Sequence, residues 1–283
     1  MFSGLASGKF PRMIRCVLLL LLSLAPLSRA EEGCEGPRTE LLILGDSQTG
    51  ANWATAYFGN FVQKCLARTQ ITFASYARGG TQPIHWLSHA GLDKIDTVYR
   101  SASEPHTPLG GSSAPVCKKR LNRLVGIHQP SRVLLFFGDN LLSATTEEIR
   151  SQYRKMIRAL EEAGIRGENC ILLTPTYEMA VASKRNVPSK NFENTMKVIK
   201  AIEAEAGPSC RILNGLELMK NSPLLKGEVL AREAVEGTSG CFGAAANDNI
   251  HYCGRAAQEL ADKVCESLND KPEAVGRAGD TLF

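Results

Sequence analysis

Short apolar segments alternate with longer amphipathic segments along most of this chain, and that alternation constrains the fold more than any other feature. The apolar segments show no polar–apolar alternation, as expected of parallel strands that are buried on both faces. Five of them are candidate strands: residues 40–46, 71–77, 132–138, 170–176 and 210–215.

The segments between these candidate strands have the periodicity of amphipathic helices. They include "NWATAYFGNFVQKCLAR", "TEEIRSQYRKMIRALEEAG", "NFENTMKVIKAIEAEAG" and, near the end, "GRAAQELADKVCESL". The second begins with Thr-Thr-Glu-Glu, a cap followed by acidic residues, and ends at Gly164. Repeated strand–helix alternation predicts an α/β fold, a three-layer α/β/α sandwich around a mostly parallel five-stranded sheet.

The first thirty residues have the layout of a secretory signal peptide. A basic start is followed by the apolar run "CVLLLLLSLAPL" and by the small residues Ser28 and Ala30, which favour cleavage after Ala30. The apolar run has about a dozen residues, fewer than the ~20 that a membrane-spanning helix needs. We therefore expect an exported protein, periplasmic or secreted, with no stable membrane insertion.

Removal of residues 1–30 leaves one predicted domain over residues 31–270 and a loose C-terminal tail over residues 271–283. The signal peptide contains no acidic residue and carries the whole formal charge of +4, on Lys9, Arg12, Arg15 and Arg29. The mature chain is therefore formally neutral, which argues against nucleic acid or an anionic lipid surface as its partner. The sequence leaves the oligomeric state open.

The cysteines agree with export. Of nine cysteines only Cys16 lies in the signal peptide, so an even number remains, as suits disulfides in an oxidising compartment. None of them forms the close C-x-x-C pair that zinc sites use. Cys170 and Cys210 each open an apolar strand, and we expect a disulfide between them and another between Cys241 and Cys253.

The first predicted strand ends in Gly45, Asp46 and Ser47, within "LLILGDSQTG". These residues could form an ordinary turn, or the serine could stand at the carboxyl end of a strand, where open α/β sheets bind ligands. A catalytic serine needs a base. Among the histidines only His251 has a matching context, "NDNIHYCGRAAQELA", with Asp248 close enough to fix the tautomer and stabilise the imidazolium.

Four motifs resemble those of the SGNH/GDSL hydrolases: "GDS" after the first strand, a glycine-bearing segment after the second, "GDN" after the third, and D-x-x-H before the final helix. The resemblance covers almost all of the mature chain and implies a flavodoxin-like hydrolase fold. It implies a triad of Ser47, Asp248 and His251, and an oxyanion hole formed by the N–H of Ser47, the N–H of Gly80 and the side-chain amide of Asn140. This chemistry requires no metal and no organic cofactor, and we expect none.

The second motif, "SYARGGTQ", departs from the family pattern, which often has asparagine where this chain has Ser75. Gly79 therefore stays a second choice for the backbone donor. In the third motif the family more often has Gly-x-Asn-Asp. Gln48 and Tyr177 are weaker candidates for contact with substrate, while Asp46, which points away from its neighbour on an extended strand, is expected to be structural.

These features together predict an exported serine esterase that hydrolyses small acyl esters, O-acetyl esters above all, on a small molecule or polysaccharide. The alternatives are a lysophospholipase or thioesterase acting on lipid acyl esters, and an O-acetyltransferase that passes the acyl group to a sugar. A non-enzymatic alternative is a carbohydrate-binding module on an inactive hydrolase scaffold, against which the intact triad residues argue.

Overall fold

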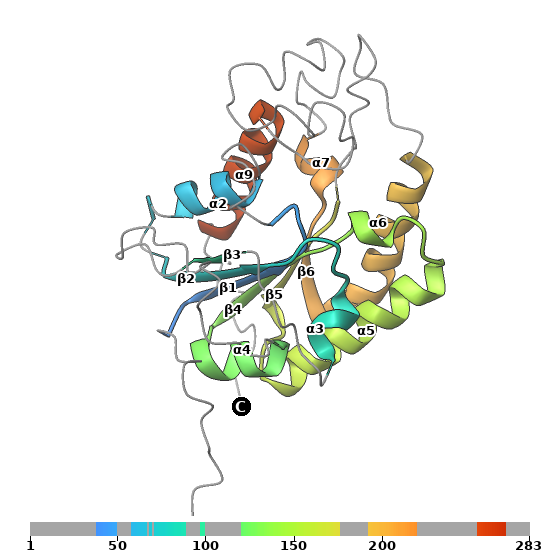
Figure 1. Ribbon diagram of the computed structural model, residues 1–283, viewed down its shortest axis with the longest axis horizontal. Helices are drawn as coiled ribbons and strands as arrows, with labels where there is room; N and C mark the ends of the chain where they lie inside the picture. Colours follow the sequence, from blue (N-terminus) through green and yellow to red (C-terminus); the bar gives the residue numbers. More distant parts are fainter. Residues whose placement is uncertain are drawn as a thin grey trace, which may run out of the picture.

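The computed structural model describes residues 38–49, 58–66, 68–69, 71–88, 97–99, 120–175, 192–219 and 254–269. Within these residues a central sheet carries helices on both faces, in three α/β/α layers (Figure 1). The predicted fold class is confirmed. The predicted signal peptide, residues 1–30, and the predicted tail, residues 271–283, lie outside the described residues.

The sheet has six strands in the order β3-β2-β1-β4-β5-β6. Their bounds are β1 Leu41–Gly45, β2 Phe73–Ala77, β3 Thr97–Tyr99, β4 Arg132–Phe136, β5 Gly167–Leu173 and β6 Cys210–Leu213. The five strands predicted from the sequence all form, and they run parallel to one another. β3 is an additional strand, antiparallel to β2, and it is too short for hydrophobic periodicity to reveal.

The helices divide between the two faces of the sheet. One face carries α2 (Phe58–Leu66), α7 (Gly215–Met219) and α9 (Gly254–Asn269). The other carries α3 (Pro83–Leu87), α4 (Leu121–His128), α5 (Thr146–Glu162) and α6 (Phe192–Ala206). Among the described residues, no helix is long and apolar enough to cross a membrane.

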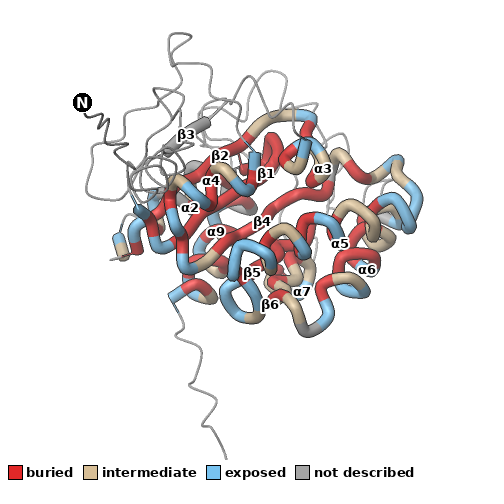
Figure 2. Tube along the Cα trace, turned by 90° about the horizontal axis from the view of Figure 1, so that it is seen from below, coloured by how far each residue is buried: buried red, intermediate tan, exposed pale blue. Residues whose placement is uncertain are grey.

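The two hydrophobic cores meet along β1, whose residues alternate between them. Leu42 and Leu44 belong to the core under α4, α5 and α6, whereas Leu41 and Ile43 belong to the core under α2 and α9. All four are fully buried, and Figure 2 shows the same burial along the neighbouring strands. Each such side chain stabilises the fold by about 1.5–3 kcal/mol, which explains why the strand segments are apolar without alternation.

Helix α5 begins where the sequence predicted. Thr145 is its N-cap: its hydroxyl accepts from the Glu148 N–H at 3.3 Å, and the Glu148 carboxylate accepts from the Thr145 N–H at 2.7 Å. The hydrogen bonds from Thr145 lower the pKa of Glu148. Past the C-terminus of the helix, Gly164 takes the left-handed conformation, with φ of 85°.

Two disulfides lie among the described residues. Cys170–Cys210 joins the neighbouring strands β5 and β6, as the sequence predicted. Cys65–Cys265 joins α2 to α9 and was not predicted, because its partners are 200 residues apart along the chain. The other expected pair, Cys241–Cys253, lies outside the described residues.

Candidate active site

The strand order places a topological switch point at the centre of the sheet. β1 lies between β2 and β4, so the chain leaves β1 toward one side of the sheet and later returns to its other side. In open α/β sheets the crevice at the carboxyl ends of two such strands is where ligands bind. Here those strands are β1, which leads into Ser47, and β4, which leads into Asn140.

Ser47 lies in a tight turn directly after β1. The Thr49 N–H donates to the Asp46 carbonyl at 3.2 Å, and the Gln48 N–H donates to Asp46 Oδ1 at 3.0 Å. The serine is 8 % exposed. These residues therefore form a turn, and that turn holds the serine at the carboxyl end of the strand.

Gly45 is required by close packing at this point. A Cβ atom on Gly45 would lie 2.6 Å from the backbone oxygen of Phe136 and still closer to the Thr49 side chain. Thr49 Oγ1 itself donates to the same Phe136 oxygen at 3.4 Å. The glycine of "GDS" thus allows the turn to approach β4 closely.

Asp46 connects the Ser47 turn to the loop after β4. Its Oδ1 accepts from the Gln48 N–H, and its Oδ2 accepts from the side-chain amide of Asn140 at 3.2 Å. Asp46 is 1 % exposed and its carboxylate is used in these internal contacts, which agrees with the structural role expected for it. Asn140 is therefore held beside the turn that carries Ser47.

Gly80 lies in the loop that follows β2, the strand on the other side of β1. Its φ of 72° is a left-handed conformation that favours glycine, and the residue is exposed. The loop is tied to β1, because the Arg78 N–H donates to the Gly45 carbonyl at 3.2 Å. The structure thus brings the segments of Ser47, Gly80 and Asn140 to neighbouring strand ends. The oxyanion roles of these residues remain predictions.

Three predicted site residues, Asp248, His251 and Tyr177, lie outside the described residues. The described chain resumes at α9, which begins at Gly254 and packs against α2. Gln48 is described and is 4 % exposed, and its carbonyl accepts from the Gly59 N–H at the start of α2. Contact of Gln48 with substrate remains a prediction.

Gln82 and Gln152 also lie near this edge, and no motif in the sequence singles them out. Gln82 donates from Nε2 to the Asn140 carbonyl at 2.6 Å, and Gln152 donates to Gln82 at 2.9 Å. Contacts between residues so far apart in sequence leave no local motif. Among the described residues, no group of three His, Cys, Asp or Glu side chains could hold a metal ion.

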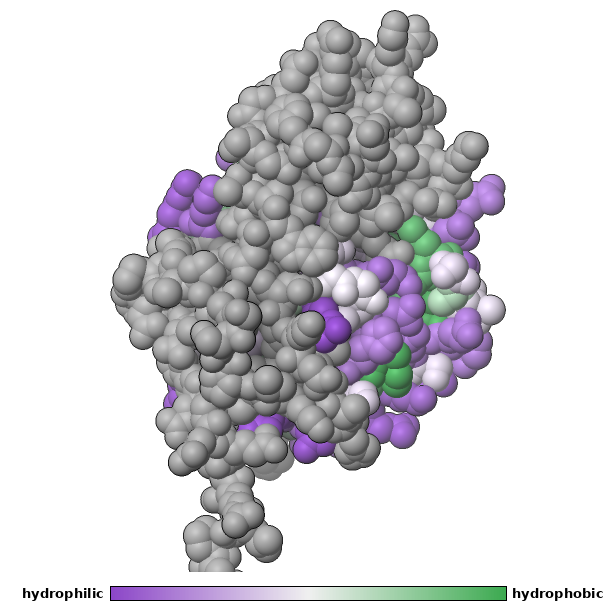
Figure 3. Space-filling view, in the orientation of Figure 1, coloured by the Kyte–Doolittle hydropathy of each residue, from purple (hydrophilic) through white to green (hydrophobic). Residues whose placement is uncertain are grey.

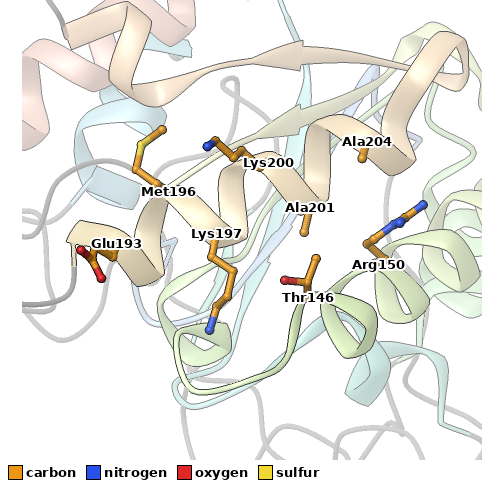
Figure 4. Close-up of a pocket in the computed structure, with 8 residues that line it drawn as sticks. All are labelled: Thr146, Arg150, Glu193, Met196, Lys197, Lys200, Ala201 and Ala204. Carbon is orange, nitrogen blue, oxygen red and sulfur yellow. The ribbon is translucent and has the colours of Figure 1, made fainter.

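A groove of about 520 Å³ lies elsewhere, between α5 and α6 on the outer face of one helical layer (Figure 4). Its lining is Thr146, Arg150, Glu193, Met196, Lys197, Lys200, Ala201 and Ala204. The described surface around these helices is mostly hydrophilic, with small apolar patches (Figure 3). Lys197 Nζ donates to the Leu142 carbonyl at 2.9 Å, so this layer helps to fix the loop that carries Asn140.

The described part of the chain is a doubly wound α/β protein with a serine-bearing turn at its switch point. No protein-family model matches the sequence, and no curated protein matches it.

Several solved structures align with most of this chain at low sequence identity. A lipase/acylhydrolase from Enterococcus faecalis is 16% identical, with a TM-score of 0.46, over 81% of this chain and 95% of that chain. A GDSL-like protein from Parabacteroides merdae is 14% identical, with a TM-score of 0.48, over 82% and 96%. A catalytic mutant of an acetylxylan esterase from Geobacillus stearothermophilus is 12% identical, with a TM-score of 0.47, over 83% and 96%.

Proposed function

We propose that this protein is an exported serine esterase that hydrolyses small acyl esters. The observation that supports the proposal most is the hydrogen-bonded junction at the switch point. There Asp46 joins the turn of Ser47 to Asn140, so a nucleophile and an amide donor lie together at the carboxyl ends of β1 and β4. His251 is the proposed base and Asp248 its partner.

The proposed reaction uses these groups in two steps. His251 accepts the Ser47 proton while the serine oxygen attacks the ester carbonyl, and the imidazolium then protonates the departing alcohol. Water, activated by the same histidine, releases the acyl group and restores the serine. Asp248 keeps the imidazole in the required tautomer throughout.

Negative charge develops on the carbonyl oxygen in both steps, and fixed donors stabilise it. An asparagine amide has two N–H bonds. One N–H of Asn140 donates to Asp46, which leaves the second for the oxyanion beside the N–H groups of Ser47 and Gly80. The Asp46 contact therefore supports Asn140 in the role proposed for it.

The proposed substrate is an O-acetyl ester on a carbohydrate, either a small molecule or a polysaccharide. This part of the proposal rests on the motif resemblance together with export and formal neutrality of the mature chain. The two disulfides support export, because disulfides persist in oxidising compartments. Lipid acyl esters as substrate, transfer to a sugar, and sugar binding without turnover are the competing outcomes of the tests.

Labelling by a fluorophosphonate probe tests the nucleophile. We expect the wild-type protein to be labelled and to hydrolyse p-nitrophenyl acetate, and we expect Ser47→Ala to lose both properties. Ser131→Ala is a matched control, because Ser131 is an exposed serine at the amino end of β4, the opposite edge of the sheet. Folded wild-type protein with neither labelling nor turnover would favour the binding module.

The same assay separates the substrate classes. Activity that falls as the acyl chain lengthens from acetate to octanoate supports the small-acyl esterase, whereas rising activity favours a lipid-directed enzyme. A sugar added as a competing acceptor distinguishes the transferase, since acetylated sugar would then accumulate in place of free acetate.

A further inference from the structure

We infer that Gln82 and Gln152 are positioning residues that hold the two predicted oxyanion donors, Gly80 and Asn140, in a fixed relation. The inference rests on the proposed function. Gln82 follows Gly80 closely in sequence and precedes α3 directly. Its Nε2 donates to the backbone carbonyl of Asn140 at 2.6 Å. A single side chain therefore joins the loop after β2 to the loop after β4.

Gln152, on α5, holds the Gln82 side chain in turn. Its Nε2 donates to Gln82 Oε1 at 2.9 Å, and its Oε1 accepts from the backbone N–H of Ile84 at 3.3 Å. This series of hydrogen bonds begins at a backbone donor and ends at a backbone acceptor. Because a backbone N–H only donates and a carbonyl only accepts, the orientation of both side-chain amides is fixed.

Both glutamines of this series are attached to helices, Gln82 at the start of α3 and Gln152 within α5. The Gln82 N–H donates to Nδ1 of His85 at 3.0 Å, which fixes the start of α3, and the neighbouring Trp86 is fully buried. Gln152 lies within the long helix α5, and both glutamines are only partly exposed. Asn140 is thus held at its carbonyl by Gln82 and at its side-chain amide by Asp46.

Such positioning matters for catalysis because oxyanion donors act only when they are already in place. A displacement of about 1 Å can lower a rate by as much as about 100-fold. Loss of one supporting hydrogen bond leaves the donors present but less well placed. The expected effect is therefore smaller than deletion of a donor, and it appears in kcat more than in KM.

The test compares Gln82→Met, Gln152→Met and the double variant with the wild-type protein in hydrolysis of p-nitrophenyl acetate. Methionine keeps the length of the side chain and removes the amide. Values of kcat are expressed per active site that the fluorophosphonate labels. We expect each single variant to lose about tenfold in kcat, with KM within about twofold of the wild type. The double variant should lose no more kcat than the less active of the two single variants, because both belong to one series of hydrogen bonds.

Two further variants make the test independent of folding. Gln152→Glu keeps the acceptor for Ile84 but has no N–H for Gln82, so it should lose kcat per labelled site as Gln152→Met does. Its melting temperature, measured in parallel, separates this loss from any loss of folded protein. Gln258→Met is the matched control, because Gln258 is exposed on α9, and it should behave as the wild type.

The outcomes separate this inference from the proposed function. Wild-type activity combined with variants whose kcat stays within about twofold, or whose losses in the double variant simply add, would overturn the positioning role and leave the esterase intact. If the variants have a smaller labelled fraction and a lower melting temperature but an unchanged kcat per labelled site, the glutamines have a structural role and the positioning role is overturned. A wild-type protein that is neither labelled nor active would overturn both.

Discussion

At the scale of single residues, the Asp46 carboxylate satisfies two donors at once, the Gln48 N–H and the Asn140 side-chain amide. An amide in its place has one oxygen for the two donors. We therefore expect Asp46→Asn to leave Asn140 poorly placed and to lower kcat about 10- to 100-fold, with little change in KM.

The measurement is kcat per labelled active site with p-nitrophenyl acetate. Asp262→Asn, an exposed position on α9, serves as the control and should retain full activity. Asp46→Asn with kcat near that of the wild type would show that Asn140 needs no support from this carboxylate.

The residues that the sequence could indicate are those in short local motifs. Ser47 could be found because glycine, aspartate and serine follow an apolar strand, and Asn140 because "GDN" follows another. Gln82 and Gln152 could not, since their contact spans 70 positions and depends on how α3 packs against α5. Sequence reasoning identified the groups proposed for the chemistry and the structural aspartate Asp46 beside them, and it missed the two glutamines that support Asn140.

At the scale of elements, the five parallel strands could be predicted because each is built around apolar residues, most of which are buried in the sheet. β5 begins earlier than expected, at Gly167, and the next two residues, Glu168 and Asn169, are polar and exposed. The pairing of this segment with β6 is also irregular. Polar residues at the end of a strand carry no hydrophobic period, so periodicity alone places such boundaries poorly.

Helices α5 and α6 are joined by a charge cluster whose pH dependence can be tested. Glu205 on α6 accepts from Arg150 at 2.6 Å and from Arg154 at 2.9 Å. The hydrogen bond from Arg154 is the largest cause of a lowered pKa for Glu205, and Arg150 acts in the same direction, while desolvation opposes them.

Because the folded state lowers this pKa, the stabilisation is present above the ordinary value of 4.5 and is lost as the pH falls through the folded value. We expect Glu205→Gln to melt about 2–4 °C below the wild type at pH 7, with the difference shrinking below pH 4.5. Thermal melts from pH 3 to pH 7 measure it, with Glu266→Gln, an exposed change on α9, as control. A difference that persists unchanged at pH 3 would contradict the assignment to this carboxylate.

At the scale of the whole molecule, the segments that carry the proposed triad come from the two ends of the described fold. Ser47 precedes α2, and His251 precedes α9, yet these two helices pack side by side on one face of the sheet (Figure 1). Cys65–Cys265 links them covalently. The sheet therefore brings the first and last parts of the domain together, and the disulfide holds them there.

This disulfide closes a loop of 200 residues, so it restricts the unfolded chain strongly. Loop-closure entropy predicts that replacing Cys65 and Cys265 together with alanine lowers the free energy of unfolding by about 5 kcal/mol. Urea unfolding under non-reducing conditions measures the loss from the midpoint and slope. The Cys170–Cys210 pair is the comparison, because its loop spans 40 residues and the same argument predicts a smaller loss for its removal. Equal midpoints for the wild type and the Cys65/Cys265 double variant would show that this link does not hold the two ends of the fold together.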